Sequence, residues 1–182
     1  MTDRYVVIGN PIAHSKSPSI HADFALQTGV DLQYCRLLSP LDGFEQTLRM
    51  LKAAGVKGAN VTVPFKQLAH DLADHRSEDV IFAQAANTLC WKADGLHAQN
   101  TDGVGLCTDL NRLLAPLGLS LHGSNVLLLG AGGASRGVLL PLLAEAPAQL
   151  VIANRTPERA QELAKEFSAA SSAVIEASRF DD

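Results

Sequence analysis

Charge and aromatic side chains are scarce in this sequence. Charged residues make up 19% of its 182 positions, against about 25% in an average globular chain. Hydrophobic residues make up 47%, which argues against intrinsic disorder. The 15 Lys and Arg residues do not outnumber the 19 Asp and Glu residues. The net charge of −4 leaves no basic excess to neutralise a phosphate backbone, so we expect no nucleic-acid partner.

Cysteines are also few. Cys35, Cys90 and Cys107 are an odd number and have no C-x-x-C spacing, which argues against a disulfide framework and a thiolate metal site. The six histidines show no H-E-x-x-H or Cys/His pattern, so we expect no metal. No apolar run approaches the roughly 18 residues that cross a bilayer, and the first residues do not resemble a secretory leader. We therefore expect a cytoplasmic protein without a membrane partner.

Short apolar runs alternate with helical patterns in the first part of the chain. Strands are expected at 5–9, 32–38 and 59–63. A helix is expected between the first two strands, with Ser17 as its N-cap and Gly29 at its end. A second helix is expected between the last two strands, with Asp42 as its cap and an end near Gly55.

A hairpin and a long helix follow. Residues 89–91 and 96–98 flank Ala93-Asp94-Gly95, which is typical of a hairpin turn. Asp102 can cap a helix that runs to Leu114 and bridges two domains. We place the domain boundary at residue 103, which gives domains of 1–103 and 104–182.

A new β-α-β unit begins at residue 126 in the second domain. Another strand begins at 174, after a small-residue stretch at 169–172 that we expect between elements. A complete dinucleotide-binding sheet needs more strands than remain, so we interpret the chain as a fragment of a longer protein. The expected fold class is α/β, with an N-terminal α/β substrate-binding domain followed by an incomplete Rossmann-like domain.

A glycine-rich turn lies between the strand at 126–129 and an apolar helix from Arg136 to about Leu143. Such a turn lets the backbone approach a pyrophosphate, whose charge the helix N-terminus stabilises. Ser135 replaces the third glycine of G-x-G-x-x-G, and a tight turn without a ligand is the alternative. The candidate cofactor-binding residues here are Gly130, Ala131, Gly132, Gly133, Ala134 and Ser135.

The end of the next strand indicates which cofactor is bound. NAD-binding sheets place an acid on the ribose about 20 residues after the first glycine, but this chain has Asn154, Arg155 and Thr156 there. Arg155, with Arg159 one turn later, offers guanidinium groups to a 2′-phosphate, which favours NADP over NAD. Solvated surface arginines are the alternative.

Three polar clusters follow the expected strands of the first domain. They are 15–17, 60–66, and the pair 87–88 with 100–102. Their small hydroxyls and amides suit a neutral, hydroxylated ligand, and one lysine with one aspartate can form a proton-transfer pair.

Six motifs resemble the NADP-dependent shikimate dehydrogenase family. They are GNPIAHSKSPSIH at 9–21, GANVTVPFK at 58–66, AANT at 85–88, NTDGVGL at 100–106, GAGGASRGVLLPLL at 130–143 and NRTPERA at 154–160. The resemblance implies a substrate domain joined to a Rossmann-like NADP domain. It also implies reversible hydride transfer between shikimate and 3-dehydroshikimate in aromatic amino-acid biosynthesis, by a monomer or a homodimer.

The resemblance also assigns roles to single residues. It implies that Ser15 and Ser17 hold the substrate carboxylate, that Thr62, Asn87 and Asp102 bind ring hydroxyls, and that Lys66 is catalytic together with Asp102. Which of the two catalytic residues takes the proton stays open. Without the resemblance, Ser17 and Asp102 would be equally good helix caps, and Thr62 an ordinary strand residue.

The sequence departs from the family's usual residues at three positions. Gln84 and Ala86 stand where the family usually has Gly and Val, and Ala98 replaces a frequent Gly. The family's C-terminal part, which returns a substrate-contacting glutamine to the first domain, has no counterpart here. Two alternatives stay open: a quinate/shikimate dehydrogenase, which often uses NAD, and a non-catalytic NADP-binding module.

Overall fold

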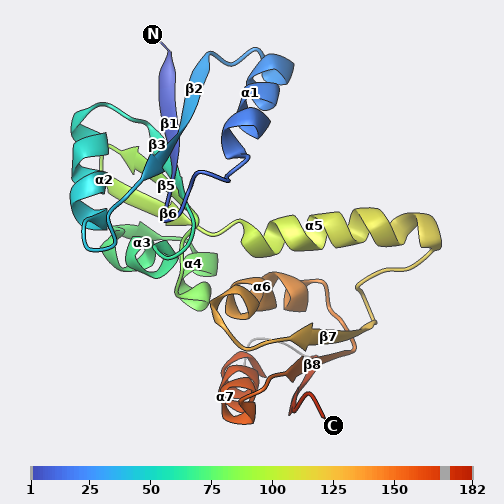
Figure 1. Ribbon diagram of the computed structural model, residues 1–182. Helices are drawn as coiled ribbons and strands as arrows, with labels where there is room; N and C mark the ends of the chain where they lie inside the picture. The colour runs from blue at the N-terminus through green and yellow to red at the C-terminus, as the bar shows by residue number, and fades with distance from the viewer. Residues whose placement is uncertain (1, 169–172, 182) are drawn as a thin grey trace. The chain divides into compact units, whose positions relative to one another are not determined.

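The computed structural model describes residues 2–168 and 173–181 (Figure 1). The small-residue stretch at 169–172 lies outside the described residues. The chain forms two compact units. Unit 1 comprises Met1–Ile81 and Ala85–Asn100, and unit 2 comprises Phe82–Gln84 and Thr101–Asp182.

Unit 1 is built on a six-stranded mixed sheet with the order β2-β1-β3-β5-β6-β4. Strand β1 pairs in parallel with both β2 and β3, β5 runs antiparallel to β3 and β6, and β4 is parallel to β6. The strands are β1 (Asp3–Gly9), β2 (Leu32–Leu38), β3 (Gly58–Val61), β4 (His75–Arg76), β5 (Thr88–Lys92) and β6 (Gly95–Gln99).

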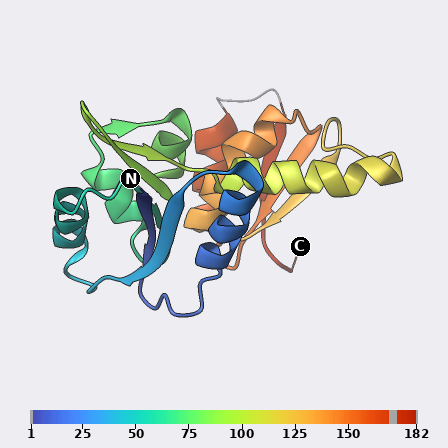
Figure 2. The ribbon, with the colours of Figure 1, turned by 90° about the horizontal axis from the view of Figure 1, so that it is seen from above.

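Helices connect the consecutive strands up to β5. The helices are α1 (Ser17–Thr28), α2 (Phe44–Ala53), α3 (Lys66–Leu72) and α4 (Glu78–Ala83). Because β2 and β3 lie on opposite sides of β1, right-handed crossovers carry α1 and α2 to opposite faces of the sheet (Figures 1 and 2). This arrangement gives the two faces of the sheet different surroundings.

One face of the sheet forms the core of unit 1. Alternate residues such as Ile8 and Leu89 are buried there against Phe44 of α2 and Phe65, the residue before α3. The rings of Phe44 and Phe65 stack with their centroids 4.7 Å apart. The other face carries the side chains of Tyr34, Tyr5, Asn60 and Thr88, so the polar residues of the sheet gather on the side of α1.

The three expected helix caps are wrong. Helix α1 begins at Ser17 itself, α2 has Gly43 at its N-cap rather than Asp42, and α5 begins at Asp102. None of these helix starts has a side-chain cap hydrogen bond. Ser17 and Asp102 are the first residues of their helices, so the N-cap positions belong to Lys16 and Thr101 instead.

Unit 2 contains a parallel sheet of β7 (Asn125–Leu129), β8 (Gln149–Ala153) and β9 (Val174–Ser178), in that order. Helix α6 (Gly133–Ala144) connects β7 to β8, and α7 (Pro157–Ser168) connects β8 to β9. Helix α5 (Asp102–Leu114) and the short 3₁₀ helix η1 (Ala115–Leu117) precede the sheet. Strands that alternate with crossover helices form a Rossmann-like arrangement, so the predicted α/β class is confirmed.

The core of unit 2 lies between its sheet and its helices. Leu139 of α6, Ile152 of β8 and Phe167 of α7 are fully buried in it. The ring of Phe82, from the short first segment of unit 2, lies 5.8 Å from that of Phe167. Within the described residues, no helix is both long and apolar enough to span a membrane.

Candidate functional site

The predicted substrate residues of unit 1 come from three chain segments that meet at one edge of the sheet. Ser15 and Ser17 follow β1, and Thr62 and Lys66 follow β3. Asn87 directly precedes β5, which is antiparallel to β3, so the beginning of β5 meets the end of β3. Ligands of open α/β sheets commonly bind at such carboxyl ends of parallel strands.

The two serines form a local pair. The Ser15 hydroxyl donates to Ser17 Oγ at 3.2 Å and accepts the backbone N–H of Ser17 at 3.3 Å. Arg36 Nε donates to the Ser15 carbonyl oxygen at 2.7 Å, which fixes the turn that carries the pair. Two adjacent hydroxyls and a nearby guanidinium suit a carboxylate ligand.

Backbone hydrogen bonds hold Thr62, Lys66 and Asn87 in place. The Thr62 N–H donates to the Ile8 carbonyl at 2.9 Å, and the Asn87 carbonyl accepts the Val61 N–H at 2.8 Å. The Lys66 carbonyl accepts the Ala86 N–H at 2.8 Å, which ties the first residue of α3 to the segment before β5. Rigid backbone positions of this kind restrict where the side chains can reach.

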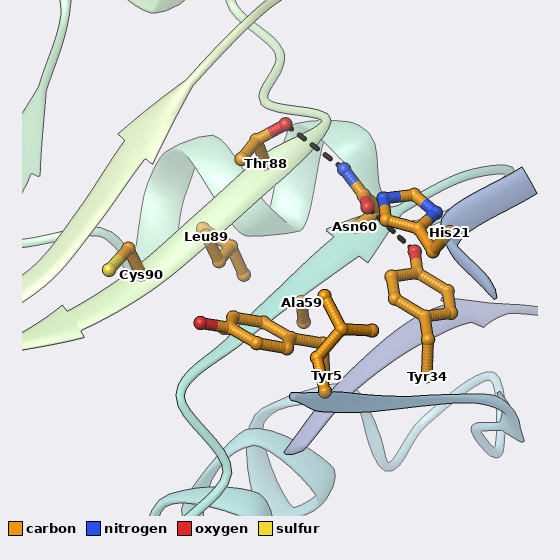
Figure 3. Close-up of a pocket in the computed structure, with 10 residues that line it drawn as sticks. Tyr5, His21, Tyr34, Ala59, Asn60, Thr88, Leu89 and Cys90 are labelled. Carbon is orange, nitrogen blue, oxygen red and sulfur yellow. Dashed lines mark hydrogen bonds between the residues drawn. The ribbon is translucent and has the colours of Figure 1, made fainter. Parts of the chain in front are cut away.

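Asn60 connects the strands beside these residues. Its side-chain N–H₂ group donates to Thr88 Oγ1 at 3.1 Å and to the Asn87 carbonyl at 3.3 Å, and the Thr88 hydroxyl donates to Asn87 Oδ1 at 2.9 Å. The Tyr34 hydroxyl donates to Asn60 Oδ1 at 2.6 Å (Figure 3). These bonds form a network that orients the side chain of Asn87.

Tyr34 is the residue of this network that sequence reasoning missed. The His21 ring stacks on it with a centroid distance of 3.9 Å, and His21 Nδ1 lies 2.9 Å from the Ser17 carbonyl oxygen. Burial raises the pKa of Tyr34 well above its usual value, and a hydrogen bond with the Ser17 side chain acts in the opposite direction. Tyr34 therefore links the serine pair to the asparagine network as a neutral phenol.

A pocket of about 230 Å³ opens beside the network. Its polar end is formed by His21, Tyr34, Asn60 and Thr88, and its walls are largely apolar (Figure 3). The predicted substrate residues are not among those of the described chain that line it. Asn60 and Thr88 line the pocket and also form hydrogen bonds with Asn87, so they belong both to the pocket wall and to the network.

Asp102 belongs to unit 2, as the first residue of α5. Its neighbour Gly103 packs closely on α6: a Cβ atom there would lie 2.6 Å from Pro141 Cγ and 2.8 Å from the Gly137 carbonyl oxygen. A larger residue at this position would push the start of α5 away from α6. The position of the Asp102 carboxyl group in unit 2 therefore depends on this glycine.

The glycine-rich turn follows the strand as the sequence indicated. Gly130 has a φ of 108°, a conformation that side chains rarely adopt, and its N–H donates to the Ala153 carbonyl at 2.7 Å. Among the described residues, a Cβ atom on Gly132 or Gly133 would meet nothing within 4 Å. The N-terminus of α6 is therefore open, and its first turn contains no acidic residue. Such an end fits a pyrophosphate.

The residues after β8 lie next to this turn, because Leu129 and Ala153 are partners in neighbouring strands. Asn154 Nδ2 donates to the Thr156 carbonyl oxygen at 2.8 Å and so shapes the loop before α7. Arg155 and Arg159 are exposed, and neither forms an ion pair within the part of the chain that the structure describes. Two exposed guanidinium groups and no acid at this strand end fit the 2′-phosphate of NADP.

Arg136 is a third arginine near the turn, but its side chain forms an ion pair with Glu166 of α7. Its Nη1 donates to Glu166 Oε2 at 2.7 Å, its Nη2 bonds Glu166 Oε1, and its guanidinium lies 5.8 Å from the centre of the Phe167 ring. This bidentate ion pair joins α6 to α7. Arg136 is therefore a structural residue of unit 2 rather than a phosphate ligand.

Comparisons with known proteins agree with this geometry. Residues 7–89 match the shikimate dehydrogenase substrate binding domain, and residues 113–182 match the shikimate/quinate 5-dehydrogenase family. The chain is 51% identical, over its whole length, to a shikimate dehydrogenase (NADP(+)) of Nitrosospira multiformis, and it covers 64% of that protein.

Solved structures give the same result. An Ael1 enzyme from Pseudomonas putida superposes with a TM-score of 0.91 and 44% identity over 99% of this chain and 64% of that one. The shikimate 5-dehydrogenase of Thermus thermophilus, in complex with NADP(H) and shikimate, superposes with a TM-score of 0.81 and 33% identity over 96% of this chain and 62% of that one. The chain thus spans less than two thirds of the length of these relatives.

Proposed function

The chain belongs to the shikimate dehydrogenase family, and from this premise we propose that it carries the substrate-binding and NADP-binding residues of a shikimate dehydrogenase. The proposed reaction is the reversible oxidation of shikimate to 3-dehydroshikimate in aromatic amino-acid biosynthesis. In this direction NADP⁺ accepts the hydride from the carbon that bears the hydroxyl, and the hydroxyl proton is released. We assign substrate binding to 1–103 and cofactor binding to 104–182.

The observation that supports this proposal is the order of the segments: Ser15 and Ser17 follow β1, Thr62 and Lys66 follow β3, and Asn87 precedes the antiparallel strand β5 at the same end of the unit 1 sheet. These residues come from separate segments and would need no common location in a protein without a polar ligand. The serine pair suits the carboxylate of shikimate, and the amide and hydroxyl groups of Asn87 and Thr62 suit its ring hydroxyls.

Lys66 and Asp102 are the proposed catalytic pair. The group that exchanges the substrate proton must lie within hydrogen-bond reach of the reacting hydroxyl, and a lysine and an aspartate that share one proton can together release it or take it up. Asp102 also has the acceptors to bind a second ring hydroxyl. Asp102 is the first residue of α5 and stands one position after the N-cap, Thr101.

Cofactor binding is proposed for the open N-terminus of α6 and the loop after β8. The turn residues Gly130 to Ser135 would hold the pyrophosphate through backbone N–H groups. Asn154, Arg155, Thr156 and Arg159 would surround the 2′-phosphate, where both arginine side chains are exposed.

We propose a cytoplasmic location and a monomeric or homodimeric state. The support for the location is chemical: Cys35, Cys90 and Cys107 are free thiols, as expected in a reducing compartment. The mass in solution, measured by light scattering after size exclusion, distinguishes a monomer from a dimer.

The test of the function measures binding and turnover separately. Isothermal titration of the chain with NADP⁺ and with shikimate reports binding, and NADPH absorbance reports oxidation of shikimate. We expect Lys66→Ala to abolish turnover, and Lys57→Ala, which changes an exposed lysine of the same unit, to leave it unchanged. Turnover that survives Lys66→Ala would contradict the catalytic role and favour the non-catalytic NADP-binding module.

Quinate and NAD⁺ are the comparison ligands, because the family matched by 113–182 includes quinate dehydrogenases. We expect shikimate to be preferred to quinate and NADP⁺ to NAD⁺. The reverse preference would identify the chain with the quinate/shikimate branch instead. Failure to bind both shikimate and quinate would refute the substrate assignment regardless of turnover.

A further inference from the structure

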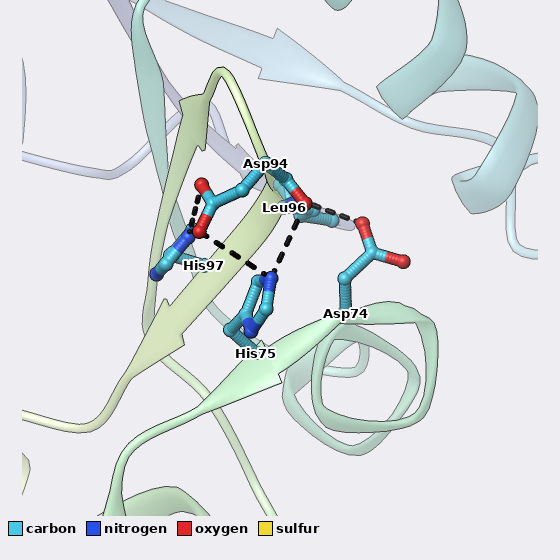
Figure 4. Close-up of polar contacts among 5 residues, drawn as sticks. All are labelled: Asp74, His75, Asp94, Leu96 and His97. Carbon is cyan, nitrogen blue, oxygen red and sulfur yellow. Dashed lines mark hydrogen bonds and ion pairs between the residues drawn. The ribbon is translucent and has the colours of Figure 1, made fainter.

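Three metal-ligating side chains meet at the far end of the β5–β6 hairpin in unit 1 (Figure 4). His75 is the first residue of β4, Asp94 lies in the hairpin turn, and His97 is in β6. His75 and His97 are direct partners in the parallel β4–β6 pair, and their rings stack with centroids 4.4 Å apart. None of these residues belongs to the proposed active site.

The Asp94 carboxylate lies between the two imidazoles. Its Oδ1 is 2.9 Å from His97 Nε2, and its Oδ2 is 3.6 Å from His75 Nε2. Each residue offers one ligand atom, and these three atoms lie within 4.8 Å of one another. Zinc bonds of about 2.0–2.2 Å in a tetrahedron place neighbouring ligand atoms roughly 3.4 Å apart. The two nitrogen–oxygen distances lie on either side of that value but end on different oxygens of Asp94, so the side chains must rotate before one oxygen and both nitrogens can face the same ion.

The donor set indicates the kind of metal. Two imidazoles and one carboxylate suit Zn²⁺ and its neighbours in the first transition row, whereas Ca²⁺ and Mg²⁺ take oxygen ligands. Three protein ligands leave a further position for water. The His75 and Asp94 side chains are 48% and 60% exposed, so an ion can reach them from solvent. His75 and His97 also line a pocket of about 330 Å³, together with Lys92 and Cys90.

A second carboxylate keeps the turn in place. Asp74 Oδ2 accepts the Leu96 N–H at 2.7 Å, and Gly95 has a φ of 140° with Asp74 so close that a Cβ atom would lie 2.6 Å from it. Asp74 thus holds the hairpin turn next to β4, and this position of the turn brings Asp94 to His75. Outer residues that fix the ligands in this way are typical of metal sites.

We propose that His75, Asp94 and His97 bind one divalent transition-metal ion, with Zn²⁺ as the representative ion. The bound ion would join β4, the two-residue edge strand, to the β5–β6 hairpin. Binding of the ion would therefore raise the melting temperature of the chain. This inference stands independently of the proposed function. It departs from the expectation of no metal, which rested on local spacing and could not register a contact between strands β4 and β6.

The experiment first strips bound metal from the chain with a chelator and then removes the chelator. The metal-free chain is titrated with ZnCl₂ in a calorimeter. We expect one ion per chain, and we expect affinity to fall by about tenfold or more in His75→Ala, His97→Ala and Asp94→Asn. His70→Ala is the matched control, because His70 also contacts a carboxylate, Asp71 Oδ1 at 2.7 Å, but has no second imidazole in that contact. We expect no change in affinity for this variant.

Two further measurements keep the proposal falsifiable. Circular dichroism checks that each variant is folded, and the imidazole NMR signals of His75 and His97 should shift together on addition of Zn²⁺. Cys90→Ser tests the neighbouring thiol, and we expect its affinity to be retained. The proposal is overturned if the wild-type chain binds no Zn²⁺, if the His75 and His97 variants bind like wild type, or if Cys90→Ser alone abolishes binding.

Discussion

The Tyr34 hydroxyl in β2 and the Asn60 side chain in β3 form a 2.6 Å hydrogen bond across the intervening strand β1. The bond connects the outermost parallel strand to the network that orients Asn87. A phenol that donates to an amide oxygen leaves the amide N–H₂ group facing Thr88, so this single contact also fixes which way the Asn60 amide points.

Replacement of Tyr34 tests the importance of that bond. Tyr34→Phe removes the donor and leaves Asn60 Oδ1 without it, so the free energy of unfolding should fall by about 1–2 kcal/mol. Urea denaturation measures the change in the free energy of unfolding. If Asn60 positions Asn87, the same substitution should also weaken the binding of shikimate. Tyr5→Phe is the control with the same chemical change. Equal losses in both variants would contradict a special role for Tyr34.

Titration of Tyr34 gives a second prediction. The sequence has two tyrosines, so Tyr5→Phe leaves Tyr34 as the single phenol. Because burial raises the pKa of Tyr34, its tyrosinate absorbance in the folded chain should appear at a pH above the ordinary tyrosine pKa of about 10. The absorbance should reach its full value when the chain unfolds. A titration midpoint near that of free tyrosine in the folded chain would contradict the burial.

The same pKa shift predicts how stability depends on pH. The raised pKa of Tyr34 means that the folded state keeps its proton while the unfolded state loses it above pH of about 10. Protonated Tyr34 therefore contributes stability that is fully present below the unfolded pKa and is lost as pH rises toward the folded pKa. Urea midpoints at increasing alkaline pH should fall less steeply in Tyr34→Phe than in wild type.

Gln84 occupies a backbone conformation that suits glycine. Its φ is 51°, directly after the end of α4 at Ala83. A left-handed residue at a helix end is usually glycine, because a side chain there costs roughly 1–2 kcal/mol. We expect Gln84→Gly to raise the free energy of unfolding by roughly 0.5–1 kcal/mol, after the extra chain entropy of glycine is deducted. The matched control is Gln99→Gly in β6, which should lower it.

Cofactor preference should depend on the loop after β8. Arg155→Ala removes a guanidinium that we assign to the 2′-phosphate, so affinity for NADP⁺ should fall by about tenfold while affinity for NAD⁺ stays the same. Lys165→Ala, which removes a cation from the last turn of α7, is the control. Calorimetric titration with both cofactors measures the ratio. A parallel loss of NAD⁺ affinity would indicate damage to the loop rather than loss of a phosphate contact.

Local patterns predicted most of the regular structure. The strand at 32–38 is predicted with its observed bounds, and the hairpin expected around Ala93-Asp94-Gly95 is confirmed, with Gly95 as the first residue of β6 rather than part of the turn. The strand-turn-helix of the glycine loop is also confirmed, although α6 begins at Gly133 rather than near Arg136. These elements follow from apolar periodicity and from glycine, which act over a few residues.

The wrong or missing predictions concern helix starts, where neighbouring residues suit the N-cap equally well, and contacts between strands. Ser17 and Asp102 have the right chemistry for caps, but both lie one position inside their helices. Strand β4 has two residues and exists because it pairs with β6, so no local run of residues marks it. The contacts of Tyr34 with Asn60 and of His75 with His97 likewise depend on strand order. Sequence periodicity carries no information on which strands become neighbours.

The short segment Phe82–Gln84 belongs to unit 2 although unit 1 precedes and follows it. The polypeptide therefore passes from one unit to the other three times rather than once. Cutting the gene after residue 100 would deprive the downstream piece of the Phe82 ring that packs on Phe167. The two units therefore cannot be exchanged between homologues by a single cut in the chain. A chimera that keeps both cores intact must take residues 82–84 from the same homologue as residues 101–182.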